Sequence, residues 1–271
     1  MLAAMKRRFE KMHGLGNDFA VFDAREAPLE MDADRARALA DRRTGIGCDQ
    51  LVVIESSETA DVRMRIWNAD GGEVEACGNA SRCVALLLQG PVGGTTRIET
   101  GGGVITAWNE RGTATVDMGE PLFAWDEIPL AYAMDTGAMP VGWEELQGPA
   151  AVNVGNPHVV FFVADSDAVE LERLGSLIEN DPLFPDRVNV NVATVEAETI
   201  RLRVWERGAG LTRACGTGAC ATAVAAIRRR LVRSTVDVRL PGGTLSIKWE
   251  PGGTILMSGA ATHVFSGEVA L

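Results

Sequence analysis

Long apolar runs and an excess of basic residues are both missing from this chain of 271 residues. No run approaches the roughly 20 apolar residues that a membrane-spanning helix requires. The N-terminal residues, in which Met5 is an alternative start to Met1, lack the apolar stretch of a signal peptide. The formal net charge is -11, whereas phosphate recognition requires a basic face. We therefore expect a cytoplasmic protein that binds neither membranes nor nucleic acid.

Paired cysteines and clustered histidines are also lacking. The chain has five cysteines and three histidines, but no Cys-x2-Cys pair occurs and the histidines are scattered, so no metal site is expected. Five cysteines in a non-secreted chain of this size do not indicate a disulfide framework. The sequence predicts thiols that bind no metal.

The chain is organised around a stretch that occurs twice, at residues 65–79 and 203–217. Each copy has a short apolar strand ending in Trp, a Gly-containing turn, and a Cys-Gly pair at the same distance from the Trp. An apolar, Ala-rich segment at helical spacing follows each pair. Cys77 and Cys215 should therefore each lie in the first turn of a helix.

A thiol at a helix start has particular chemistry. The first backbone N–H groups of a helix have no internal partner and carry partial positive charge, so a thiol pKa of about 8.5 can fall toward neutrality there. The same groups can hold a carboxylate. A single cysteine at such a position is more often structural, but a matched pair favours two bases acting on opposite faces of one carbon. Cys48, Cys83 and Cys220 lack the duplicated context, and Cys83 and Cys220 are expected in the core.

The duplication extends beyond the cysteines. The segment around Asn17 resembles that around Asn156, and Gln50 and Asn189 each open an apolar strand. Two repeats of this length indicate two similar domains rather than a solenoid. Strands dominate, and each half has one helix apolar enough to be buried within its sheet.

The expected fold class is α/β (α+β), with two pseudo-symmetric domains, each a mainly antiparallel sheet around a central helix. The first domain is expected at 1–120 with a C-terminal strand at about 262–271, and the second at 121–261. A further amphipathic helix is expected in each half, at 33–43 after an N-cap at Asp32, and at 168–179.

Six motifs together resemble the diaminopimelate epimerase family. They are His13-Gly14-Leu15-Gly16-Asn17-Asp18-Phe19, Gly45-Ile46-Gly47-Cys48-Asp49-Gln50, Asn68-Ala69-Asp70-Gly71, Ala76-Cys77-Gly78-Asn79, Gly155-Asn156-Pro157-His158, and Glu206-Arg207-Gly208-Ala209-Gly210 with Ala214-Cys215-Gly216-Thr217-Gly218. The resemblance implies a cofactor-free isomerase that interconverts LL- and meso-2,6-diaminopimelate, a step toward lysine and peptidoglycan. It also implies that each domain is a curved sheet around its central helix, and family members are often homodimers.

The resemblance also implies roles for single residues. Cys77 and Cys215 are the acid–base groups, with His158 and Glu206 beside them. The implied substrate-binding residues are Asn17, Gln50, Asn68, Gly78, Asn79, Asn156, Asn189, Glu206, Arg207, Gly216 and Thr217. Ala80-Ser81 departs from the family's usual Gly-Ala, but both residues are small and fit a first helical turn.

Lysine is scarce, which bears on the cofactor. Pyridoxal chemistry requires a Schiff-base lysine, and Lys6, Lys11 and Lys248 all lie outside the duplicated stretch. This favours a site with no cofactor.

Three alternatives remain open. They are an enzyme like proline or hydroxyproline racemase, a non-catalytic member of the fold and a redox-active member. The racemases usually carry His where Asn79 stands, and the presence of both matched cysteines argues against a non-catalytic chain.

Overall fold

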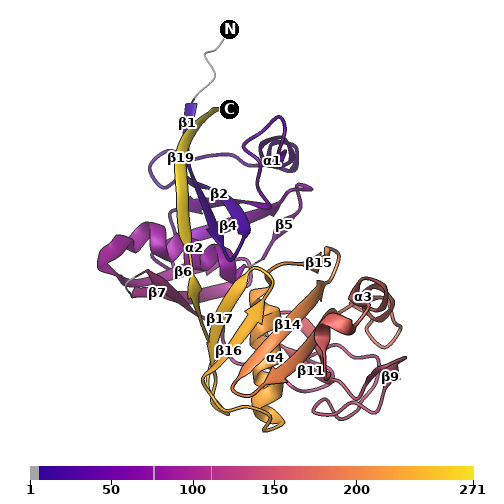
Figure 1. Cartoon of the computed structure of the whole chain (residues 1–271). Coiled ribbons are helices and arrows are strands. Elements are labelled where there is room, and N and C mark those ends of the chain that lie inside the picture. Colours follow the sequence, from indigo (N-terminus) through magenta and orange to yellow (C-terminus); the bar gives the residue numbers. More distant parts are fainter. Residues whose placement is uncertain (1–5, 76, 111) are drawn as a thin grey trace. The chain divides into compact units, whose positions relative to one another are not determined.

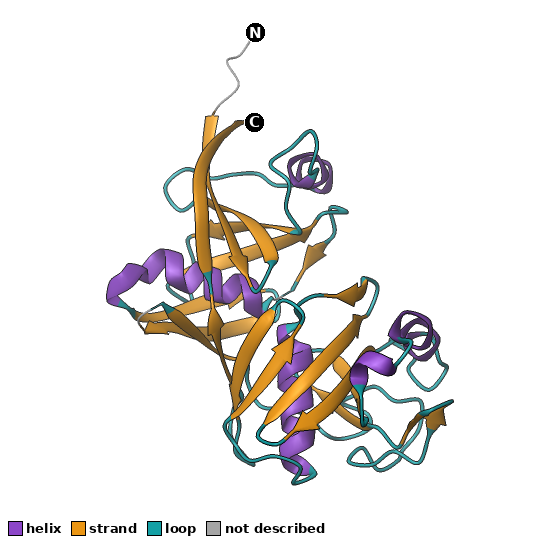
Figure 2. Cartoon of the chain, in the orientation of Figure 1, coloured by secondary structure: helices purple, strands orange, loops and turns teal. Residues whose placement is uncertain are grey.

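The computed structural model describes residues 6–75, 77–110 and 112–271 (Figure 1). The two possible start residues, Met1 and Met5, lie outside the described residues, and so does Ala76 of the first cysteine motif. The chain divides into two compact units, which we call unit 1 (1–116 with 259–271) and unit 2 (117–258). Each unit mixes strands with a few helices (Figure 2), so the expected mixed α and β fold class is confirmed.

Unit 1 begins and ends with paired strands. Its elements are β1 Lys6–Gly14, β2 Asn17–Asp23, α1 Ala33–Ala40, β3 Gln50–Glu55, β4 Val62–Asn68, β5 Glu73–Val74, α2 Gly78–Gln89, a 3₁₀ turn Gly90–Val92, β6 Gly94–Thr100, β7 Gly103–Glu110, β8 Thr113–Asp117 and β19 Thr262–Ala270. The last strand, β19, pairs antiparallel with β1 along its length.

Unit 2 repeats much of this order. Its elements are β9 Gly142–Trp143, β10 Leu146–Gln147, β11 Ala150–Asn153, β12 Pro157–Phe162, a 3₁₀ turn Ser166–Ala168, α3 Leu171–Glu179, β13 Asn189–Glu196, β14 Thr199–Glu206, β15 Gly210–Thr212, α4 Gly216–Arg228, β16 Val236–Leu240, β17 Gly243–Lys248 and β18 Leu256–Ala260.

The two units share their strand pairing as well as their element order. In unit 1, β2 runs parallel to β3, and β3 pairs antiparallel with β4, which runs parallel to β6. In unit 2, β12 runs parallel to β13, and β13 pairs antiparallel with β14, which runs parallel to β16. The register also matches, because Phe19 lies opposite Gln50 and His158 lies opposite Asn189. The duplication seen in the sequence is therefore present in the backbone.

One helix in each unit is buried because its sequence is apolar nearly all round. Helix α4 buries almost every residue from Gly216 to Ala226 and packs against β11 to β14, β16 and β17. Helix α2 buries the run Asn79–Ala85 and packs against β1, β6 and β7. Helices α1 and α3 are amphipathic. Helix α1 packs against β3 and β4, and helix α3 packs against β13, β14 and β15.

Two helix limits differ from the sequence-based expectation for local reasons. Helix α1 begins after the expected N-cap Asp32, but it ends at Ala40 because the Asp41 side chain accepts the N–H groups of Arg43 and Thr44. The segment expected as one helix at 168–179 is a 3₁₀ turn followed by α3, since the Asp165 side chain caps the turn and Val169 is extended. Within 6–75, 77–110 and 112–271, no helix is long and apolar enough to cross a membrane.

Gly175 on α3 provides a stability test, because a Cβ there would lie 2.5 Å from Cγ of Trp205 on β14. Overpacking a filled interior costs roughly 1–3 kcal/mol, more than the helix propensity that alanine gains. We expect Gly175→Ala to lower the free energy of unfolding by about that amount in chemical denaturation.

Ser176→Ala, on the exposed neighbouring position, is the control and should stay within about 0.5 kcal/mol of the parent. Equal stabilities for the two variants would contradict the close approach of α3 to Trp205.

Candidate active site

Cys77 and Cys215 occupy the same position in the two units. Each is the extended residue directly before a buried helix, with φ and ψ of -149° and 112° at Cys77 and -128° and 110° at Cys215. The structure therefore places both at the N-cap rather than inside the first turn. Gly78 and Gly216 are the first helical residues, so the unpaired backbone N–H groups of α2 and α4 begin beside each thiol.

The side chain of Asn17, a predicted binding residue, lies close to the thiol of Cys77. Its Oδ1 accepts a hydrogen bond from Asn79 Nδ2 at 3.1 Å and lies 4.0 Å from Sγ of Cys77. Asn79 is buried on the first turn of α2, and its own Oδ1 accepts from Nη2 of Arg82 at 2.8 Å. Three of the predicted residues thus form one group in unit 1.

Gln50 and Asn68 form a second pair in the same unit. They lie opposite each other on β3 and β4, and Nε2 of Gln50 donates to Oδ1 of Asn68 at 2.8 Å. Both are partly exposed. The pair presents amide groups at the strand ends, where a polar head group can be bound.

Cys215 is far more enclosed than Cys77. Its Sγ accepts the backbone N–H of Gly218 at 3.3 Å and lies 3.5 Å from Oγ1 of Thr217. A Cβ at position 218 would lie 2.7 Å from Oδ1 of Asn191 and 3.3 Å from Sγ, so only glycine allows this approach. Cys215 is 4% exposed, whereas Cys77 is partly exposed.

Glu206 lies beside the thiol of Cys215, and its carboxyl group is hydrogen-bonded to Thr212 and Cys215. Burial raises the pKa of Glu206, and these hydrogen bonds offset only part of the rise. Burial also raises the pKa of Cys215 well above its ordinary value, and the charge of Glu206 raises it further. A helix N-terminus can lower the pKa of a thiol, but at Cys215 burial and Glu206 outweigh the bonds from Thr217 and Gly218.

His158 is fully buried on β12, and both of its ring nitrogens contact amides. Asn191 Nδ2 lies 3.0 Å from the carbonyl of Val159 and 3.0 Å from Nδ1 of His158. A nitrogen facing a carbonyl must be the amide NH₂, so Nδ1 is the acceptor. The ring proton is therefore on Nε2, which donates to Oδ1 of Asn156 at 2.9 Å. Burial lowers the pKa of His158 to about 3, so the ring is neutral.

Asn189 and Arg207 are joined by a backbone contact. Oδ1 of Asn189 accepts the N–H of Arg207 at 2.9 Å, and Nδ2 of Asn189 donates to the carbonyl of Pro157 at 2.9 Å. Asn189 is buried, whereas Arg207 is exposed and its guanidinium donates to the carbonyl of Asp186. In this arrangement Asn189 supports the turn that carries Glu206 and Arg207.

The site in each unit thus combines an N-cap cysteine with amides and, in unit 2, a carboxyl group. The family model described as diaminopimelate epimerase matches residues 9–124 and 150–264. The chain belongs to the diaminopimelate epimerase family.

Relatives of the family resemble the chain over nearly its whole length. Proteins named diaminopimelate epimerase are 66% identical in Rhizorhabdus wittichii (98% of this chain and 97% of the relative), 65% in Sphingopyxis alaskensis (97% and 97%) and 58% in Zymomonas mobilis (96% and 96%).

Solved structures that share the fold are more distant in sequence. A predicted epimerase from Pseudomonas aeruginosa has a TM-score of 0.70 at 16% identity, covering 97% of this chain and 99% of that one. A hydroxyproline epimerase from Agrobacterium vitis has a TM-score of 0.68 at 16% identity, covering 98% and 93%. These similarities bear on the fold alone.

Several residues around the predicted site residues of each unit were not expected from the sequence. Asn191 shares a strand face with Asn189, two positions away, and this alternation was the available signal. Thr212, which contacts Glu206, and Asp49, which contacts Asn17, carried no such signal, although Asp49 directly precedes Gln50.

The neutral His158 makes the stability of this family member depend on pH. Between pH 6.5 and about 3 the unfolded chain protonates this histidine and the folded chain does not. Stability should therefore fall as the pH is lowered through 6.5, by up to about 1.4 kcal/mol per pH unit from this group. His158→Gln lacks this contribution, so its unfolding free energy should change less between pH 7 and pH 5 in denaturant titrations.

The parent chain and His158→Gln share all other titrating groups, so each serves as the control for the other. Parallel plots of unfolding free energy against pH for the two proteins would show that His158 is charged in the folded state.

Proposed function

We propose that the chain interconverts LL- and meso-2,6-diaminopimelate without a cofactor, using Cys77 and Cys215 as the two acid–base groups. The observation that carries this proposal is the matched N-cap position of the two thiols before α2 and α4. Relatives that are 58–66% identical and named diaminopimelate epimerase support the substrate. The hydroxyproline epimerase shares only 16% identity, so a cyclic amino acid is the weaker candidate.

In this mechanism, one thiolate removes the α-proton and the other thiol delivers a proton to the opposite face. The α-carboxylate binds backbone N–H groups at the helix starts, near Gly78, Asn79, Gly216 and Thr217. Donors aimed at the charge that develops on the carboxylate of the carbanion can supply about 3–4 kcal/mol each. The amides and Arg207 bind the remaining amino and carboxylate groups, with Asn17, Gln50, Asn68, Asn156 and Asn189 as the amide set.

Glu206 and His158 have different tasks in the proposal. Cys215 has a raised pKa and rests as a thiol, so it must lose its proton before it can act as a base. Glu206 touches it and takes that proton, since burial keeps the pKa of the carboxyl group above its ordinary value. The neutral His158 acts through Asn156, whose side-chain amide it orients.

The lysines support a cofactor-free reaction. Lys11 is paired with Asp18 at 2.5 Å, Lys6 is paired with Glu268 on the surface and Lys248 is exposed. Lys11 lies in the charged cluster beside Asn17, but its Nζ is already bound by Asp18 and by the carbonyl of Gly47. We further propose that the enzyme acts in the cytoplasm as a homodimer in lysine and peptidoglycan precursor synthesis. Sedimentation would test the oligomeric state.

The decisive experiment incubates the purified protein with LL-diaminopimelate in deuterated water and resolves the stereoisomers. Early product should carry one deuterium at the inverted carbon while recovered substrate stays largely unlabelled, because the delivered proton comes from a second, solvent-exchanged thiol. Cys77→Ala and Cys215→Ala should each abolish epimerisation, since one face then lacks an acid or base.

Cys220→Ala, in the buried body of α4, is the matched control and should retain turnover. Unlabelled early product, or near-normal turnover in either Cys77→Ala or Cys215→Ala, would rule out the two-base mechanism.

The role of Glu206 predicts a separate kinetic change. Glu206→Gln removes the proton acceptor beside Cys215 and should lower kcat by about 10²-fold or more. The acidic limb of kcat against pH that arises from Glu206 should also disappear. Because the pKa of Glu206 is raised, this limb lies above the pH at which an ordinary glutamate titrates.

Glu198→Gln, at an exposed turn of unit 2, removes the same charge without touching Cys215 and should leave kcat unchanged. A wild-type kcat in Glu206→Gln would exclude proton transfer through this carboxyl group.

A further inference from the structure

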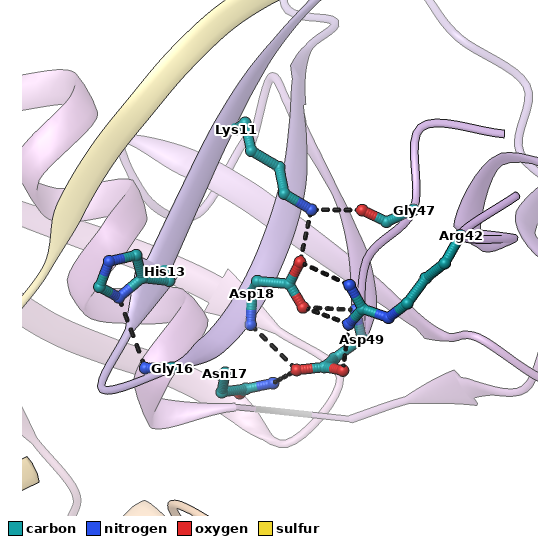
Figure 3. Close-up of polar contacts among 8 residues, drawn as sticks. All are labelled: Lys11, His13, Gly16, Asn17, Asp18, Arg42, Gly47 and Asp49. Carbon is teal, nitrogen blue, oxygen red and sulfur yellow. Dashed lines mark hydrogen bonds and ion pairs between the residues drawn. The ribbon is translucent and has the colours of Figure 1, made fainter. Parts of the chain in front are cut away.

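A cluster of charged side chains in unit 1 lies beside Asn17 (Figure 3). Asp18 is bound by two cations, with Lys11 Nζ at 2.5 Å and Arg42 Nη2 at 2.6 Å. The same Arg42 nitrogen lies 2.7 Å from Oδ1 of Asp49. Burial alone would raise the pKa of Asp18, but the bonds from Arg42 and Lys11 hold it well below its usual range. The cluster is therefore a fixed arrangement of charges.

Asp49 connects this cluster to Asn17. Oδ2 of Asp49 accepts from Nδ2 of Asn17 at 3.2 Å and from the backbone N–H of Asp18 at 3.1 Å. Its other oxygen accepts from Arg42, so both carboxylate oxygens of Asp49 have hydrogen-bond donors. An ionised carboxylate has no proton to donate, so the group that faces it from Asn17 must be the NH₂.

The carbonyl oxygen of the Asn17 amide is also fixed, because it accepts a hydrogen bond from Asn79. A guanidinium only donates, so Arg82 requires the oxygen of Asn79 to face it and leaves the NH₂ of Asn79 pointing at Asn17. Two amides thus lie in series between an acceptor at Asp49 and a donor at Arg82. Only one orientation of each amide satisfies all of these bonds.

We propose that Asp49 is a positioning residue that fixes the Asn17 amide with its carbonyl oxygen toward the thiol of Cys77. Arg42 holds Asp49 in the geometry that this requires. The oxygen of Asn17 lies 4.0 Å from Sγ of Cys77, so the orientation decides whether an acceptor or a donor faces this thiol. A facing acceptor favours the protonated thiol and a facing N–H favours the thiolate.

The importance of this geometry for catalysis rests on the proposed function, but the geometry can be tested without substrate. Asp49→Asn keeps the size of the side chain and removes the obligate acceptor, so the Asn17 amide is held by Asn79 alone and turns more readily to present its NH₂ to Cys77. Alkylation of Cys77 by iodoacetamide, followed by peptide mass spectrometry, should then proceed about threefold faster or more. Alkylation of Cys215 in the same molecules should not change.

Three further variants test whether a change in the Cys77 alkylation rate comes from the orientation of the Asn17 amide rather than from loss of charge or stability. Asp49→Glu retains a carboxylate and should return the Cys77 rate to within about twofold of the parent. Asp23→Asn removes the same charge at the far end of β2, where Asp23 pairs with Arg25, and should leave the rate unchanged. If Asp49→Asn does not fold, Asp49→Ala also removes the acceptor that faces Asn17 and should raise the rate in the same direction.

Turnover with diaminopimelate separates this inference from the proposed function. We expect Asp49→Asn to lose turnover while Asp23→Asn keeps it. A changed Cys77 rate in a protein whose parent does not act on diaminopimelate would refute the proposed function and leave the positioning role intact. An unchanged Cys77 rate in folded Asp49→Asn, or an equal change at Cys215 or in Asp23→Asn, would overturn the positioning role.

Discussion

The surroundings of Cys77 and Cys215 depend on the burial of the helices that these cysteines precede. Helix α4 is enclosed by strands along almost its whole length, so it cannot rotate without breaking close packing. The extended residue before it is thereby fixed, and so is the direction in which its backbone N–H groups point. A helix with an exposed face would leave the thiol free to shift by rotation of the helix. The apolar sequence of α4 is thus part of the chemistry at Cys215.

The parts of the structure that follow from local pattern could be predicted from the sequence. Alternating and helical apolar spacing indicated the mixed α and β fold, which is confirmed. The repeated stretch located Cys77 and Cys215 at helix starts, although inside the first turn rather than at the N-cap, and Asp32 was recognised as an N-cap from its residue type and position. Each of these conclusions needs only neighbouring residues, because helix starts and strand faces are set by short-range geometry.

The remaining features arise from contacts between residues far apart in the sequence, which composition and spacing do not reveal. The raised pKa of Cys215 comes from burial and Glu206, and neither follows from a position at a helix start. The tautomer of His158 is set by Asn191, on another strand. The surroundings of the two thiols also differ, since Glu206 lies beside Cys215 and the amide of Asn17 lies beside Cys77. Duplication of the backbone has preserved the positions of the thiols but not their surroundings.

The pairing of β19 with β1 has a consequence for synthesis on the ribosome. Domains generally fold in the order in which they emerge, with the N-terminal one first. Here unit 1 takes its last strand, β19, from residues that follow the whole of unit 2. Unit 2 is contiguous from 117 to 258 and can fold while β1 still lacks this partner. The nascent chain therefore completes its N-terminal unit last, and until then the edge of β1 that receives β19 is open to other strands.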